Sequence, residues 1–149
     1  MTKKRTAALC LLLFTAVFFT ACTGGADTDA KTVIEMELTA DYDDSDPFIH
    51  EKLFYLPEDV ETPELQIAFE MKGETGLLEI ADNETKDVIW SDSWSGNTEK
   101  TDFAVPLDGL QTEREYVIRF TGTGIEYAKI TATADAGLVK ERGKPAKSK

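Results

Sequence analysis

The chain has 149 residues, and its 28 acidic against 16 basic side chains give a formal net charge of −12 at pH 7. Such a surface repels nucleic acid and anionic lipid headgroups, so we expect no nucleic-acid ligand. It favours a cation or a basic partner, and the alternative interpretation is that the charge serves only to keep an anchored domain soluble and clear of a negative membrane. The single histidine, His50, excludes a multi-histidine zinc site, and no serine stands in a nucleophile-elbow context. We therefore expect no enzyme, no catalytic residue and no obligatory cofactor, with His50 as a loop residue near the start of a strand.

Residues 1–21 predict a helical signal peptide. A compact basic segment at 3–5 (KKR) is followed by an apolar run over about residues 7–19. This run is too short for a bilayer core of roughly 30 Å, which needs about 20 apolar residues, and it has the length of a secretory signal.

The apolar run ends at Phe19-Thr20-Ala21-Cys22, which resembles the lipobox of bacterial lipoproteins. Thr20 and Ala21 fit that pattern, whereas Phe19 stands where leucine is usual. The resemblance implies that Cys22 receives lipid, including palmitate, and becomes the mature N-terminus. The protein would then be extracytoplasmic and anchored to the cell membrane or the outer membrane. An ordinary cleaved signal peptide and an uncleaved anchor are the alternatives.

The remainder divides into three segments. Residues 22–31 are small and polar after the cysteine and predict a tether, residues 32–139 predict one domain, and residues 140–149 predict a disordered basic tail. The other cysteine, Cys10, would leave with the signal peptide, so the domain must fold without a disulfide. The tail either solubilises the C-terminus, contacts an anionic envelope polymer or lipid, or folds back onto the acidic domain.

The domain is predicted to be all-β. Most of its segments alternate apolar and polar residues with the period of two that marks a half-buried strand, and none keeps a helical period. About eight short strands at roughly ten-residue spacing favour a single antiparallel β-sandwich of about seven to nine strands. The predicted strands are Thr32–Thr39, Lys52–Leu56, Leu65–Met71, Gly76–Ala81, Lys86–Ser91, Thr101–Leu107, Glu115–Thr121 and Ile125–Thr133.

An acidic run after the first strand is the candidate metal site. Asp41, Asp43 and Ser45 stand at alternate positions with Asp46 beside them, and calcium prefers hard oxygen ligands of this kind. The run does not match an EF-hand, which requires glycine where Asp46 stands. A calcium site and a solvated loop are the two interpretations.

The segment around the second tryptophan is the candidate ligand site. Trp94 lies among small polar residues in or beside a loop, and an exposed tryptophan flanked by Asp92 and Asn97 is typical of surfaces on which a sugar ring stacks. The alternative interpretation is that Trp94 closes the open end of the sandwich.

Leu110 precedes Tyr116 by six residues, and this stretch resembles the corner between two sheets in fibronectin type III and other immunoglobulin-like domains. Similar corners occur in jelly-roll and carbohydrate-binding sandwiches. The resemblance supports a sandwich, implies a hydrogen bond from the Tyr116 hydroxyl back to the turn, and does not choose the topology.

The function predicted from these features is a membrane-anchored, non-enzymatic binding or interaction module. Its partners would be the membrane, through Cys22, and an envelope protein or glycan. A carbohydrate- or calcium-binding module is the alternative, and a small hydrolase using two carboxylates that meet in space is a more remote one.

Overall fold

Alternation of apolar and polar side chains produces nine β-strands in the computed structural model, which describes residues 31–41, 46–57, 64–135 and 139–142. The described residues contain no helix, and so none that is long and apolar enough to cross a membrane. The strands are β1 (Thr32–Thr39), β2 (Phe48–Tyr55), β3 (Glu64–Lys72), β4 (Thr75–Asp82), β5 (Val88–Ser95), β6 (Thr98–Pro106), β7 (Glu115–Thr123), β8 (Tyr127–Ala134) and β9 (Lys140–Arg142).

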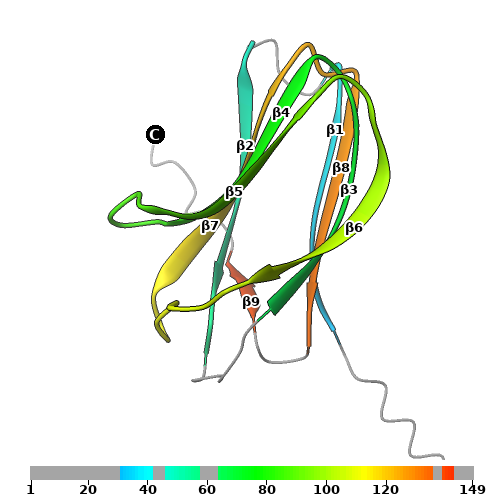
Figure 1. The fold of residues 1–149 in the computed structure, drawn as a ribbon. Coiled ribbons are helices and arrows are strands. Elements are labelled where there is room, and N and C mark those ends of the chain that lie inside the picture. Colours follow the sequence, from blue (N-terminus) through cyan, green and yellow to red (C-terminus); the bar gives the residue numbers. More distant parts are fainter. Residues whose placement is uncertain (1–30, 42–45, 58–63, 136–138, 143–149) are drawn as a thin grey trace, which may run out of the picture.

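The strands form two antiparallel sheets packed face to face (Figure 1). Sheet A has the order β1-β8-β3-β6, and sheet B has the order β5-β4-β7-β2-β9. The first eight strands thus follow the order of a jelly roll, in which connections pass repeatedly from one sheet to the other. An immunoglobulin-like sandwich divides its strands differently. The predicted all-β antiparallel sandwich is confirmed, while the predicted signal peptide lies outside the described residues.

The core lies between the two sheets. It consists of the side chains that alternate residues of each strand direct inward. Leu65, Ile67, Phe69 and Met71 are all buried, as their alternation predicted. They meet the inner side of sheet B, where the rings of Phe69 and Phe120 lie 6.1 Å apart. Burial of side chains of this size contributes about 1.5–3 kcal/mol each before the entropy of ordering them is subtracted.

The corner between β6 and β7 has the predicted hydrogen bonds. The hydroxyl oxygen of Tyr116 accepts from the backbone N–H of Gln111 at 2.6 Å, and the hydroxyl donates to the Gln111 carbonyl at 3.4 Å. Leu110 packs against the core beside it. The corner therefore fixes the passage of the chain from sheet A to sheet B.

The strand boundaries differ most from the prediction at the start of β2 and at the end of β5. Strand β2 begins at Phe48, four residues before the predicted start, because Phe48 is buried opposite Gly122 of β7. His50 consequently lies in a strand, and its prediction as a loop residue is wrong. Strand β5 extends to Ser95, so Trp94 belongs to a strand as well.

The prediction of a disordered tail from residue 140 is wrong for its first three residues. Lys140–Arg142 form β9, which pairs with β2. The buried Val139 leads into this strand, Glu141 forms an ion pair with Lys52 at 2.9 Å, and the Arg142 guanidinium lies 5.0 Å from the centre of the Tyr55 ring. These contacts come from residues distant in sequence, which composition alone does not reveal. Residues 143–149 lie outside the described residues.

Candidate functional site

The candidate sugar platform, Trp94, packs against the core. Its ring is stacked on Phe69, with centroids 4.1 Å apart and an interplanar angle of 27°. The ring centroids of Trp94 and of Phe103 in β6 lie 5.9 Å apart. Trp90 also stacks on the Phe103 ring, with centroids 5.8 Å apart. These four half-buried or buried rings close the side of the sandwich where β5 and β6 meet. The sequence did not indicate that Trp90 and Phe103 are neighbours of Trp94, because their proximity depends on the pairing of strands.

Asp92 and Asn97, predicted beside Trp94, lie in different surroundings. Asp92 is exposed on β5, and its Oδ1 accepts a hydrogen bond from Ser93 N at 2.8 Å. Asn97 lies in the turn after β5, where its Oδ1 accepts from Gly73 N at 3.1 Å and so ties this turn to the turn between β3 and β4. The structure thus places Asp92 and Trp94 on one side of one strand, and it gives the Asn97 carbonyl oxygen a partner within the fold.

The candidate calcium loop is described only at its two ends. Asp41 follows β1 and is exposed, and Asp46 precedes β2, with its Oδ1 3.4 Å from Gly124 N. Asp43 and Ser45 lie outside the described residues, as does Cys22. Within residues 31–41, 46–57, 64–135 and 139–142, no group of three or more His, Cys, Asp or Glu side chains has the arrangement of a metal site. The calcium site remains a prediction.

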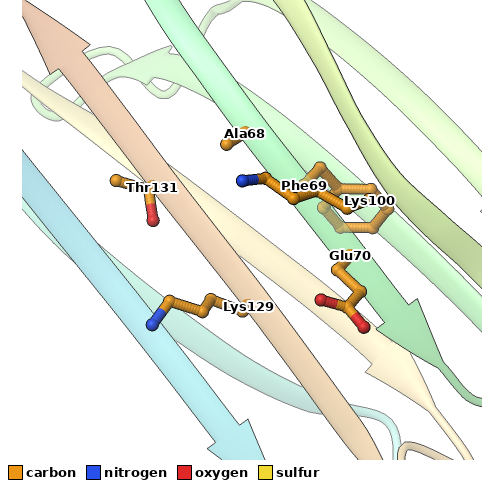
Figure 2. Close-up of a pocket in the computed structure, with 6 residues that line it drawn as sticks. All are labelled: Ala68, Phe69, Glu70, Lys100, Lys129 and Thr131. Atoms are coloured by element: carbon orange, nitrogen blue, oxygen red, sulfur yellow. The ribbon is translucent and has the colours of Figure 1, made fainter.

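A hollow of about 300 Å³ lies on the outer face of sheet A (Figure 2). Its floor is Ala68, the smallest outward side chain of β3, which stands opposite Thr131 of β8 and Asp102 of β6. Lys100 and Lys129 flank the floor, and Figure 2 shows the Lys129 side chain directed toward β1. The hollow therefore results from one small residue surrounded by long ones on neighbouring strands, which the linear sequence did not indicate.

Lys129 is held by two carboxylates of β1. Its Nζ lies 3.2 Å from Glu37 Oε2 and 3.5 Å from Glu35 Oε1. The hydrogen bond to Glu37 and the charges of both carboxylates raise the pKa of Lys129 above its ordinary value of 10.5. This lysine stays protonated at physiological pH with its charge already matched, so it offers a ligand in the hollow little net attraction.

Asp82 is the buried acid among the described residues. Its Oδ1 accepts from Thr85 N at 2.9 Å and Glu84 N at 2.8 Å, and Arg114 lies 3.0 Å from Oδ2. The hydrogen bond from Thr85 lowers the pKa of Asp82 most, burial opposes it, and the Glu84 amide and the Arg114 charge lower it further. The carboxylate is thus kept ionised in a turn, which is the reverse of what a general acid requires.

A second, open hollow of about 400 Å³ surrounds Arg114. It is lined by Asn83, Glu84, Glu113, Arg114 and Glu115. Two of its glutamates are held in place, because Glu84 lies 3.7 Å from Arg114 and Glu115 binds both Asn83 and Arg142. The pairing of these carboxylates with cations and an amide is the pattern of a stabilised turn.

Comparison with known proteins gives a family and no function. No curated protein matches the chain. A family model described as a domain of unknown function, DUF4624, matches residues 25–146, which include both sheets. This chain belongs to the DUF4624 family.

Proposed function

We propose that this chain is an extracytoplasmic lipoprotein, lipidated at Cys22, whose sandwich is a non-enzymatic interaction module for a basic partner in the cell envelope. The anchor rests on the motif that ends at Cys22 after a basic and apolar leader. Attachment through two or three acyl chains on one cysteine would be effectively permanent, since a single chain holds only marginally.

The direction of the chain suits such an anchor. Nine residues separate Cys22 from the start of β1 at Thr32, and they span at most about 30 Å. Strand β1 begins at the lower end of the sandwich in Figure 1 and runs for eight residues, or about 26 Å, to the other end. The turns Gly73–Glu74, Gly96–Asn97 and Gly124–Glu126 lie at that far end and would point away from the membrane.

One observation supports a basic partner: single cations of the domain are each shared by two carboxylates. Arg119 lies between Glu51 at 2.8 Å and Glu79 at 3.7 Å on sheet B, just as Lys129 lies between two glutamates on sheet A. Arg114 is likewise shared by Asp82 and Glu84. In each group the carboxylates outnumber the cation, and the pairs of Lys129, whose side chains are 38–52% exposed, contribute little to stability. The surplus charge is therefore available to steer a basic partner and to repel acidic ones.

The experiment compares wild-type chain with Cys22→Ser in intact cells, followed by chemical cross-linking. We expect the wild type in the membrane fraction and Cys22→Ser in the soluble one. The partner cross-linked to the wild type should have a basic surface, and its affinity for the purified chain should fall about 10-fold between roughly 0.05 and 0.2 M salt. Equal fractionation of the two proteins would refute the anchor, and a salt-independent or absent partner would refute the interaction.

The alternative role, glycan binding at Asp92, Trp94 and Asn97, has less support. A sugar needs an open aromatic face, and one face of Trp94 is occupied by Phe69. The Asn97 oxygen that would accept from a hydroxyl already accepts from Gly73. Calcium binding at Asp41, Asp43, Ser45 and Asp46 stays the alternative prediction for that segment, and a melting temperature that differs between CaCl2 and EDTA would support it.

A further inference from the structure

Strand β5 is an edge of sheet B. It hydrogen-bonds to β4 on one side and has no neighbour in the sheet on the other among the described residues. Its eight residues include no lysine, arginine or proline, which are common guards of free edges. By contrast, the edge strand β6 carries Glu99, Lys100 and Asp102 and ends at Pro106. Among its residues, β5 has a single charged one, Asp92.

Asp92 points to the inner side of the sheet. It stands opposite Leu78, between Trp90 opposite Ile80 and Trp94 opposite Gly76. Leu78 and Ile80 are buried, which identifies this row as the one that faces the core. Asp92 itself is exposed, accepts a hydrogen bond from Ser93 N and forms no ion pair within the part of the chain that the structure describes. A carboxylate therefore stands between two tryptophans at an open edge.

We propose that an extended segment of a partner protein adds to the free edge of β5 as a further strand of sheet B. Its inward residues would be a lysine or arginine beside Asp92, flanked by apolar side chains against Trp90 and Trp94. The backbone ladder supplies affinity, and the alternating side chains supply selectivity, as in other cases of strand addition. This inference rests on the proposed function and assigns its partner a surface and a sequence pattern.

The charge of Asp92 selects among incoming strands. A basic residue neutralises it, whereas an apolar or acidic strand leaves a carboxylate desolvated without a partner, which is costly. A second copy of this chain is disfavoured for the same reason, because antiparallel pairing of β5 with itself about Asp92 would bring two carboxylates together. Asp92 thus both guards the edge against self-association and recognises a basic strand.

The chain itself supplies the reporter, since Trp90 and Trp94 are its only tryptophans. The probe is the synthetic peptide Thr-Val-Thr-Lys-Thr-Val-Thr, titrated into the purified full chain while tryptophan emission is recorded. One comparison peptide has glutamate in place of lysine, and another has the lysine sequence with every backbone amide N-methylated. We expect a saturable change with the lysine peptide, about 10-fold weaker binding of the glutamate peptide, and no binding of the N-methylated one.

The variant Asp92→Asn should bind the lysine and glutamate peptides about equally. The matched control Asp102→Asn makes the same change on β6, where Asp102 faces the outer side of sheet A, and should behave as the wild type. Absence of a saturable change with the lysine peptide, binding of the N-methylated peptide, or discrimination that survives Asp92→Asn would overturn the inference. If those results accompany a salt-sensitive partner cross-linked in cells, the edge is wrong and the proposed function stands. If the peptides behave as expected and no cellular partner exists, the proposed function fails instead.

Discussion

Replacing Trp94 with alanine separates a packing role from a ligand-binding role. Truncation of a fully buried large aromatic costs about 3–5 kcal/mol. Trp94 is half-buried and stacked on Phe69, and such a stacked pair contributes about 0.5–1.5 kcal/mol beyond its buried area. We therefore expect Trp94→Ala to lower the free energy of unfolding by about 2–3 kcal/mol, a large share of the 5–15 kcal/mol typical of a domain.

The assay is urea unfolding followed by circular dichroism, with the slope compared between variants to confirm that the same surface unfolds. Trp94→Phe keeps a ring against Phe69 and should lose less than the alanine variant. Ser91→Ala, at an exposed outward position of the same strand, should change stability by no more than about 0.5 kcal/mol. A loss below about 0.5 kcal/mol for Trp94→Ala would refute the packing role and leave the ring available to a ligand.

The corner at Tyr116, the turn at Asp82 and the acidic segment that begins at Asp41 can each be tested by unfolding measurements. Tyr116→Phe should cost about 1–2 kcal/mol in urea unfolding, because the Gln111 N–H loses its acceptor. The pKa of Asp82 is lowered below its ordinary 3.8, so its carboxylate stabilises the fold above that pH, and this contribution is lost as pH falls through the folded-state pKa. The free energy of unfolding of Asp82→Asn should consequently decrease less steeply below about pH 4 than that of the wild type. The melting temperature should be the same in about 1 mM CaCl2 and in EDTA, as a solvated Asp41–Asp46 loop requires.

Each of these has a clear contrary result. An unchanged urea midpoint in Tyr116→Phe would mean that the corner hydrogen bond does not hold the turn. If the free energy of unfolding depended on pH in the same way for wild type and Asp82→Asn at acidic pH, the titrating group would lie elsewhere. A melting temperature several degrees higher in CaCl2 than in EDTA would show that calcium binds the folded chain and would contradict the solvated loop.

The sandwich was predictable where its cause is local. The alternation in Leu65–Met71 is visible in seven residues, and the structure buries the four predicted side chains. The order of strands was not predictable in the same way, because the pairing of β1 with β8 joins residues about ninety positions apart, such as Thr39 and Tyr127. Strand β9 shows the limit most clearly: Lys140–Arg142 has no apolar pattern and owes its conformation to β2.

The candidate ligand site was only partly predictable for a related reason. The small polar residues around Trp94 drew attention to it, and closure of the open end of the sandwich was one of two interpretations. The choice of partners for Trp94 and Asn97 depends on Phe69 and Gly73, which belong to β3 and the turn that follows it. The hollow around Ala68 likewise requires three strands to be in register before it exists. A surface feature that several strands build together can be predicted only once the order of the strands is known.

Mass spectrometry of the mature N-terminus tests the proposed anchor most directly. The proposal predicts that protein isolated from membranes begins at Cys22, lacks residues 1–21 and carries the added mass of acyl chains on that cysteine. An unmodified Cys22, or a mature N-terminus at any other residue, would contradict it.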